Sequence, residues 1–374
     1  MKIWVIGRSY PEKNNRMSGS FELEQAKLLA NKGHDVTYIA CVFHPFRKVK
    51  KWGFCSWDEE NIHIYTYSQF YFPGKLRIYV DSFQKKIWRI LLEGVEKQQG
   101  TPDIIHVHYP TLLTHPSVIL GYRQKGTRII VTEHWSKVQM GQVNDHELKQ
   151  LKKYVSEADH FICVGKPLKE KIQELTQTKR EIIVLPNVVP DYFICRKKDW
   201  DDFRFVAVGR LVPVKQFDKL IRAFWKAYSC EKNVTLTIIG GGCENKQLRK
   251  MIDKLGASEQ INLTGTLTRN ETAERISSSD VLVCYSRYET FSVPVIESWY
   301  CGLPVIASDA IGAAEYFDES LGLLIPNNDD NKLIVSLIKI KNDYEKYSRE
   351  LIHSFAENHF SEKEVYEKLM KVYI

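Results

Sequence analysis

The sequence contains no apolar run that approaches the roughly 18 residues needed to cross a bilayer. Its most apolar stretch, residues 291–308, is interrupted by Pro294, Glu297 and Pro304. At the N-terminus, the apolar run after Lys2 is too short for the core of a secretion signal. These absences argue against a helical membrane protein. They predict that the N-terminal residues form a first strand and that the chain stays in the cytoplasm.

Closely spaced cysteines are also missing. The eight cysteines lie far apart, and none forms a C-x-x-C pair. This spacing favours reduced thiols over a disulfide framework or a zinc site. Disorder is excluded as the main state, because 374 residues that are 44% apolar and 12% aromatic can bury a core in each of about two domains.

The net charge of +7 is unevenly distributed. Residues 1–190 contain 28 Lys and Arg against 19 Asp and Glu, whereas residues 191–374 contain 25 against 27. Much of the basic excess lies among aromatic residues in segments 46–52 and 70–77. This pattern suits an anionic membrane surface or an anionic substrate, and the alternative is a solvated surface loop. The segments match no nucleic-acid-binding module, so we expect no nucleic-acid partner.

The first half of the chain alternates short β-branched runs with amphipathic stretches, which is typical of a parallel sheet covered by helices. We expect strands at residues 2–7, 35–40, 103–107, 128–132, 160–164 and 181–185. We expect helices at residues 20–33, 78–97, 111–126, 145–158 and 167–175.

A second series of the same kind follows a polar connector at residues 190–202. Its expected strands are 204–208, 235–239, 260–263, 281–284, 304–307 and 322–325, and its expected helices are 217–228, 244–255, 271–278, 294–301 and 330–341. The fold class is therefore α/β, with two Rossmann-like doubly wound domains. Such sheets bind ligands at the carboxyl ends of their strands, which predicts a site in a cleft that the two domains face.

Two motifs in the second half suit a phosphorylated ligand. The first motif follows the carboxyl end of an expected strand and contains Gly209, Arg210 and Lys215. The glycine lets the backbone approach a ligand closely, and the two cations can bind a diphosphate. The alternative is that both cations are ordinary loop charges. The stronger motif is segment 289–297, which runs into a helix with Pro294 in its first turn. Its backbone amides can face an anion, while Glu289 and Glu297 can accept hydrogen bonds from sugar hydroxyls.

In this order, the two motifs resemble the G-R-x-x-x-x-K loop and the E-x(7)-E motif of the family-4 retaining glycosyltransferases of GT-B fold. The resemblance covers nearly the whole chain. Its further motifs are segments 238–242, 263–265 and 307–315 in the second half, and segments 103–108, 132–134 and 186–187 in the first.

This resemblance implies roles for individual residues. Arg210, Lys215 and the amides of Phe291, Ser292 and Val293 would bind the donor diphosphate. Glu297 would hold the nucleotide ribose, and Glu289 and His134 would contact the sugar as catalytic residues. The further donor-site candidates are Gly209, Gly241 and Thr264. The acceptor-side candidates are Gly19, His108, Arg47, Lys48, Lys50 and Lys51.

Some positions depart from the family pattern. A single Gly19 stands where a glycine pair is frequent, and Ser292 replaces a frequent glycine. A D-x-D sequence at residues 199–201 lies in the connector, so we expect no metal site there. The segment after strand 235–239 does not complete G-x-G-x-x-G, which argues against a nicotinamide cofactor.

The resemblance implies a retaining, metal-independent hexosyltransferase with a UDP- or GDP-sugar donor and no cofactor. Residues 1–190 would bind the acceptor, residues 191–360 the donor, and helix 361–374 would pack back on the first domain. We expect a saccharide acceptor, polyprenyl-diphosphate-linked, in bacterial capsule, exopolysaccharide or O-antigen synthesis, with the enzyme peripheral on the inner face of the cell membrane. The alternatives are a soluble acceptor, a non-hydrolysing nucleotide-sugar epimerase and a non-catalytic GT-B binding protein.

Overall fold

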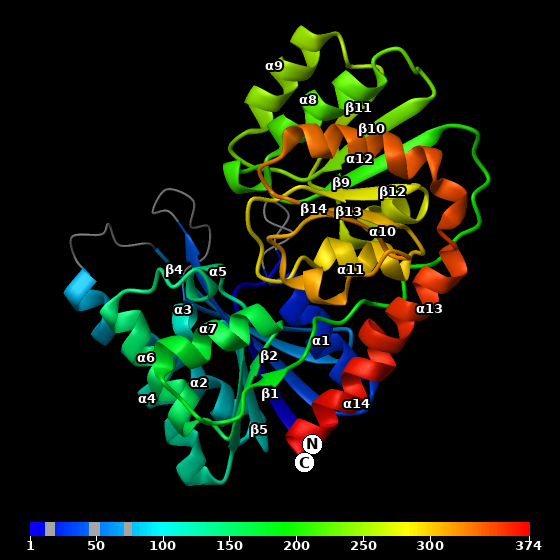
Figure 1. Cartoon of the computed structure of the whole chain (residues 1–374). Helices are drawn as coiled ribbons and strands as arrows, with labels where there is room; N and C mark the ends of the chain where they lie inside the picture. The colour runs from blue at the N-terminus through cyan, green and yellow to red at the C-terminus, as the bar shows by residue number, and fades with distance from the viewer. Residues whose placement is uncertain (12–18, 45–52, 71–76) are drawn as a thin grey trace. The chain divides into compact units, whose positions relative to one another are not determined.

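The computed structural model describes residues 1–11, 19–44, 53–70 and 77–374, which divide into two compact units. Unit 1 comprises Met1–Val188 and Val365–Ile374, and unit 2 comprises Val189–Glu364. In each unit, helices cover a central sheet (Figure 1). The end of the chain therefore returns to unit 1 after unit 2 is complete.

The sheet of unit 1 has the strand order β3-β4-β2-β1-β5-β6-β7-β8. All neighbouring strands are parallel except β3, which pairs antiparallel with β4 at the edge. Its strands are β1 (Lys2–Gly7), β2 (Asp35–His44), β3 (Gly53–Glu59), β4 (Ile62–Phe70), β5 (Ile104–His108), β6 (Arg128–Glu133), β7 (His160–Cys163) and β8 (Ile183–Val184).

Helices cover both faces of this sheet. They are α1 (Ser20–Asn31), α2 (Arg77–Gln99), α3 (Pro110–Leu113), α4 (Pro116–Ile119), α5 (Ser136–Gln139), α6 (Asp145–Glu157), α7 (Lys166–Thr176) and α14 (Glu362–Tyr373). Ile3 and Val5 of β1 share a core cluster with α1 and α14. Trp4 lies between them in sequence and packs edge to face on Tyr122, with ring centroids 5.6 Å apart, because successive strand residues point to opposite faces.

The sheet of unit 2 is entirely parallel among the described strands, in the order β11-β10-β9-β12-β13-β14. Its strands are β9 (Phe203–Val208), β10 (Val234–Ile239), β11 (Ile261–Gly265), β12 (Val281–Cys284), β13 (Val305–Ser308) and β14 (Gly322–Ile325). Its helices are α8 (Phe217–Tyr228), α9 (Asn245–Leu255), α10 (Arg269–Ser277), α11 (Val293–Tyr300), α12 (Asp330–Asn342) and α13 (Arg349–Phe360).

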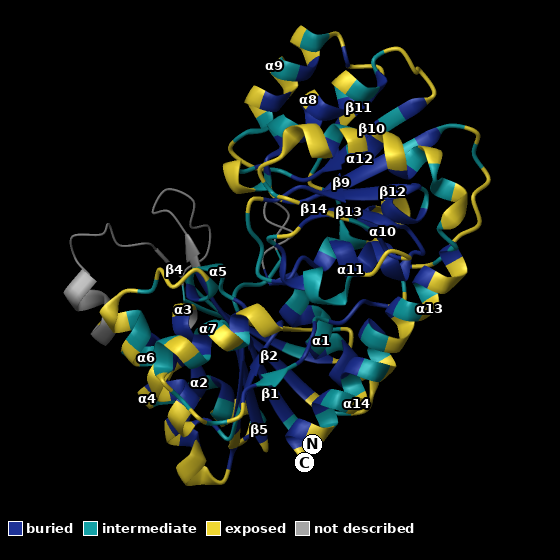
Figure 2. Ribbon diagram, in the orientation of Figure 1, coloured by how far each residue is buried: buried dark blue, intermediate teal, exposed yellow. Residues whose placement is uncertain are grey.

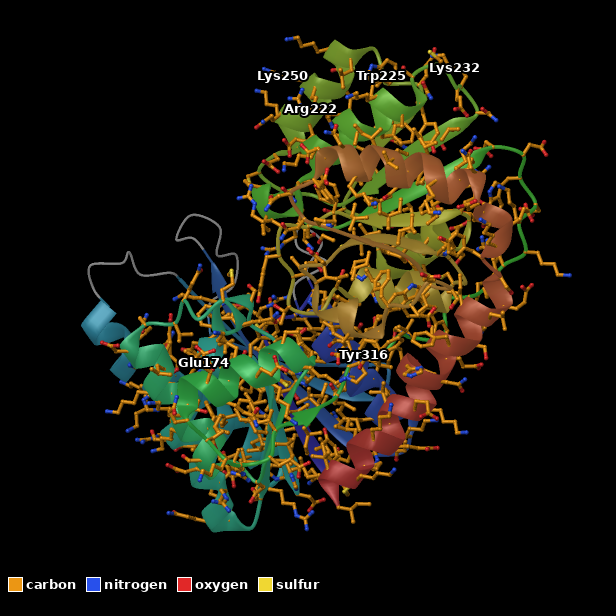
Figure 3. The ribbon with its side chains drawn as sticks, viewed as in Figure 1. Glu174, Arg222, Trp225, Lys232, Lys250 and Tyr316 are labelled. Atoms are coloured by element: carbon orange, nitrogen blue, oxygen red, sulfur yellow. The ribbon has the colours of Figure 1, made fainter. Side chains whose placement is uncertain are left out.

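The core of unit 2 lies on both faces of its sheet, whose strands are mostly buried (Figure 2). On one face, Phe205 of β9 packs on Phe224 and Tyr228 of α8. Trp299 of α11 stacks on Phe360 of α13, with centroids 6.3 Å apart. Side chains such as Arg222 and Lys250 project outward from α8 and α9 (Figure 3).

The structure confirms the predicted α/β class with two doubly wound parallel sheets, and it differs from the prediction locally. Strands β3 and β4 and helices α5 and α13 were not expected. The helix predicted over residues 111–126 is divided into α3, α4 and a 3-10 helix at Leu120–Lys125. It breaks because Pro116 favours an extended residue before it, and His115 has φ −99° and ψ 114°.

None of the helices in the described ranges combines the length and the apolar content needed to cross a membrane.

Candidate functional site

The order of the strands in unit 2 reverses between β9 and β12. β10 and β11 extend the sheet on one side of β9, while β12, β13 and β14 extend it on the other. In open parallel sheets, ligands bind outside the carboxyl ends of the strands at such a switch point. Residues 209–216 follow β9 and residues 285–292 follow β12, and Arg287 N donates a hydrogen bond of 2.8 Å from the second segment to Val214 O of the first.

Lys215 and Glu289 form an ion pair across this switch point. Their side chains are only 18% and 9% exposed, and Ser286 Oγ donates a hydrogen bond of 3.1 Å to Glu289 Oε1. Burial lowers the pKa of Lys215 to about 8, and Arg210 acts in the same direction. An anionic ligand can replace Glu289 as the partner of Lys215, which leaves the carboxylate to accept hydrogen bonds from hydroxyl groups.

The glycine-rich segment after β10 packs directly on the backbone after β9. Leu211 N donates a hydrogen bond of 2.9 Å to Gly241 O. A Cβ on Gly240, whose φ is 149°, would lie 1.8 Å from Gly209 O. Only glycine allows this approach. The contact fixes the backbone on both sides of Arg210, whose own side chain is exposed.

Helix α11 starts at the same edge of the sheet. Ser292 precedes it with φ 79° and ψ 75°, a left-handed conformation that costs a residue with a Cβ roughly 1–2 kcal/mol. Pro294 stands in the first turn, where no intrahelical hydrogen bond is lost. Within the described ranges, no residue accepts a hydrogen bond from the amides of residues 291–293. These amides and the helix dipole suit an anion.

Glu297 lies one turn further along α11 and is 1% exposed. Arg269 Nη2 at the start of α10 lies 2.5 Å from Glu297 Oε1. The guanidinium also stands over the ring of Phe193, 5.1 Å from its centroid. Arg269 was not predicted from the sequence, although a carboxylate inside an apolar helix signals that some partner exists. Arg269 fixes the carboxylate that was predicted to hold a ribose.

In unit 1, the buried carboxylate of Glu133 holds the turn that carries His134. Glu133 Oε1 accepts hydrogen bonds of 3.0 Å from the amides of both His134 and Trp135. Its Oε2 accepts one of 2.6 Å from Thr111 Oγ1. Burial raises the pKa of Glu133, while these hydrogen bonds oppose that change. The direction in which the His134 side chain leaves β6 is thereby set.

His134 also belongs to a column of stacked rings. Its ring lies between those of Tyr109 and His108, with centroid separations of 4.8 Å and 5.2 Å. The ring of His106 follows at 4.4 Å from that of His108, and the guanidinium of Arg8 lies 4.7 Å from the ring of Tyr109. Burial lowers the pKa of His134 and brings that of His108 to about 3, so both rings are neutral near pH 7.

The remaining predicted positions are dispersed. Gly19 precedes α1 with φ 82°, and Thr264 Oγ1 donates a hydrogen bond of 2.9 Å to Gly265 O at the end of β11. Arg47, Lys48, Lys50 and Lys51 lie outside the described residues. Across the part of the chain that the structure describes, no three His, Cys, Asp or Glu side chains are grouped so that they could hold a metal ion.

Two family models match the chain, one in each half. Glycosyltransferase Family 4 matches residues 21–191, and Glycosyl transferases group 1 matches residues 194–358. Together they span both units almost completely.

Two bacterial enzymes are among the proteins whose sequences are similar to this chain. The lipopolysaccharide core biosynthesis glycosyltransferase LpsD of Rhizobium meliloti is 27% identical over 235 residues, which are 61% of this chain and 66% of that protein. The N-acetyl-alpha-D-glucosaminyl L-malate synthase of Bacillus anthracis is 24% identical over 335 residues, or 84% and 81%. Among solved structures, Anabaena HepE in complex with UDP-glucose matches with a TM-score of 0.73 at 14% identity, over 99% of both chains.

Proposed function

We propose that this chain, which belongs to the family-4 glycosyltransferases of GT-B fold, moves a hexose or related sugar from a nucleotide-diphosphate sugar to a saccharide acceptor. The observation that carries the proposal is the Lys215–Glu289 pair at the switch point of unit 2. The amides of residues 291–293 begin a helix at the same edge. This edge combines a cation, free amides and a carboxylate that can accept hydrogen bonds from hydroxyl groups. These are the groups that a sugar diphosphate requires.

Each donor group then has a partner in unit 2. Arg210, Lys215 and the amides of residues 291–293 bind the diphosphate. Glu297, held by Arg269, accepts hydrogen bonds from the ribose hydroxyls. The diphosphate displaces Glu289 from Lys215, and Glu289 then accepts a hydrogen bond from a hydroxyl of the sugar. The structure of HepE with UDP-glucose supports a nucleotide sugar as donor by similarity of fold. UDP and GDP sugars both meet these requirements.

The proposed reaction breaks the bond between the anomeric carbon and the diphosphate, so negative charge develops on the leaving phosphate. The cations and the start of α11 lie where they can stabilise that charge, which makes a metal ion unnecessary. We assign no covalent nucleophile. The acceptor hydroxyl attacks on the face of the departing phosphate, which takes its proton, and the anomeric configuration is retained. His134 contacts a sugar hydroxyl.

The proposal is tested first by thermal unfolding in the presence of UDP, GDP, ADP and their sugars. A nucleotide present at about 100 times its dissociation constant adds about 2.7 kcal/mol of stability, or about 5–10 °C for a domain of this size. We expect one base to give this shift. Absence of a shift with every nucleotide would contradict the proposal.

Transfer assays separate the alternatives once the donor base is known. A glycosyltransferase gives a glycosylated product only when an acceptor is added. A non-hydrolysing epimerase converts the nucleotide sugar without any acceptor, and a non-catalytic binding protein shows the thermal shift but neither transfer nor hydrolysis. Retention is read from the anomeric configuration of the product.

We further propose that the acceptor is lipid-linked and that unit 1 binds the inner face of the cell membrane, as part of bacterial surface polysaccharide synthesis. The similarity to LpsD supports the pathway class. The support in the structure is α2, where Phe83 and Ile90 are 39% and 45% exposed and Lys86 and Arg89 are exposed between them. Apolar side chains flanking cations on one helix suit the surface of an anionic bilayer.

Flotation with phosphatidylglycerol vesicles tests this surface. Each basic residue near an anionic bilayer contributes about 1 kcal/mol, so Lys86→Glu with Arg89→Glu is expected to weaken binding by more than tenfold. The matched control is Lys149→Glu with Lys152→Glu, which reverses two exposed charges at the same spacing on α6. Equal binding of both double variants, or no binding of the unaltered protein, would refute the membrane proposal.

A further inference from the structure

The contact between His108 and His134 raises the question of which nitrogen carries the proton. His108 Nδ1 lies 2.9 Å from His134 Nε2. One of these two atoms must donate and the other accept, because both rings are buried and neutral imidazole carries a single proton. The choice also determines what the far side of each ring can do, since the second nitrogen takes the opposite role.

The surroundings of His108 decide between the two arrangements. His108 is 1% exposed, and its Nε2 has no hydrogen-bond partner among the described residues. If His134 donated to His108, this Nε2 would carry an unpaired, buried N–H. If His108 donates, the same atom is a bare lone pair, and buried acceptors without partners are less rare than buried donors. The second arrangement is therefore favoured.

The inner end of the ring column is anchored separately. His106 Nδ1 accepts hydrogen bonds from Tyr373 Oη at 2.7 Å and from Gln25 Nε2 at 3.3 Å. Its Nε2 then donates to Thr132 Oγ1 at 2.7 Å. His106 stacks on His108. Both nitrogens of His106 already have hydrogen-bond partners, so neither is available to bond with His108. His106 therefore packs against the ring of His108 without competing for the hydrogen bond that His108 Nδ1 donates.

We propose that His108 is a positioning residue that donates from Nδ1 to His134 and so holds His134 with its own proton on Nδ1. His134 then presents an N–H donor, and not a lone pair, to an oxygen of a sugar hydroxyl. This role in binding rests on the proposed function. The tautomer itself is a property of the free protein and does not depend on any substrate.

Nitrogen NMR of the protein labelled with ¹⁵N-histidine tests the tautomer directly. The unaltered, ligand-free protein is expected to show His134 protonated on Nδ1 and bare on Nε2, with the His134→Gln variant used to assign the signals. A His134 ring protonated on Nε2 would overturn the proposal, whether or not the protein transfers any sugar. Absence of transfer with an intact Nδ1–H signal would instead count against the proposed function alone.

Two substitutions separate hydrogen bonding from packing. His108→Phe keeps a ring in the column but removes the donor, whereas His108→Asn loses the ring but keeps an amide N–H at the position of Nδ1. We expect His108→Phe to lower kcat/KM about tenfold, which corresponds to the loss of one hydrogen bond. In this variant the proton of His134 should no longer be confined to Nδ1. We expect His108→Asn to retain activity within about threefold. Normal kinetics in His108→Phe with loss in His108→Asn would show that the residue acts only through packing.

Discussion

Replacing Arg269 with methionine is expected to lower the free energy of unfolding of unit 2 by about 3–5 kcal/mol. The two charged groups are 13% and 1% exposed, so removal of the arginine leaves the Glu297 carboxylate buried beside an apolar neighbour. The carboxylate then stays buried without the positive charge of Arg269 that offsets its loss of hydration. The variant is also expected to lose nucleotide binding, because the carboxylate that should hold the ribose is no longer fixed.

A double variant distinguishes the structural part of this effect from the functional part. Buried ion pairs replaced by apolar residues of similar size are often neutral for stability. Arg269→Met combined with Glu297→Leu should therefore regain most of the lost stability but none of the nucleotide binding. Urea denaturation gives the first quantity and titration with the nucleotide diphosphate gives the second.

The control for this experiment is an exposed pair in the same unit. Lys232 and Glu259 approach to 3.9 Å with side chains 66% and 87% exposed, and Lys232 lies on the outer surface of the unit (Figure 3). Lys232→Ala should leave stability nearly unchanged, since solvent screens such pairs. An Arg269→Met variant as stable as this control would contradict the assigned role of the buried pair.

Replacing Lys215 with methionine is expected to lower kcat/KM for the nucleotide sugar by about 100-fold or more. The amine binds the diphosphate and stabilises the charge that develops on the leaving phosphate, so both binding and reaction suffer. Affinity for the nucleoside diphosphate should fall, while affinity for the nucleoside alone should not. Lys219→Met is the matched control, because Lys219 lies four residues further along the chain and pairs with Asp330 at 3.2 Å. Equal losses in the two variants would contradict the role of Lys215.

The depressed pKa of Lys215 adds a dependence on pH. Burial lowers this pKa to about 8, and a bound diphosphate raises it again because it favours the charged amine. Only the charged form attracts the ligand, so affinity should be constant below about pH 8. It should then fall by up to tenfold per pH unit above that value. Titration between pH 7 and 9.5 measures this, and an affinity independent of pH would contradict the prediction.

The strands and helices of unit 2 were largely predictable from local sequence. Helix α8 has the predicted bounds, Phe217–Tyr228, because a strongly amphipathic stretch begins and ends sharply there. Strands β12 and β13 of that sheet are short runs in which every residue is buried. By contrast, β3 and β4 mix polar and aromatic residues, and their turn lies at Glu60 and Asn61, which both have positive φ. Two positive φ values suit a tight hairpin turn, but Glu-Asn is not one of the residue pairs, such as Asn-Gly, that predict such a turn from sequence.

The site was predictable only as far as each motif is contiguous. Lys215 and Glu289 were each identified, but their contact depends on β9 and β12 being neighbours. The partner of Glu297 could not be read from spacing, because Arg269 lies on another helix. The His108–His134 contact follows from strand register, since His108 is paired with Thr132, two residues before His134. Register itself depends on the whole sheet.

The most direct test of the account is a crystal structure of the protein with its nucleotide-sugar donor. We expect the diphosphate to contact the Lys215 amine and the amides of residues 291–293, and the ribose hydroxyls to contact the Glu297 carboxylate. Glu289 should have exchanged Lys215 for a hydroxyl of the sugar. A donor bound at another place, or one in this place with Lys215 still paired to Glu289 and the diphosphate out of reach of both, would contradict it.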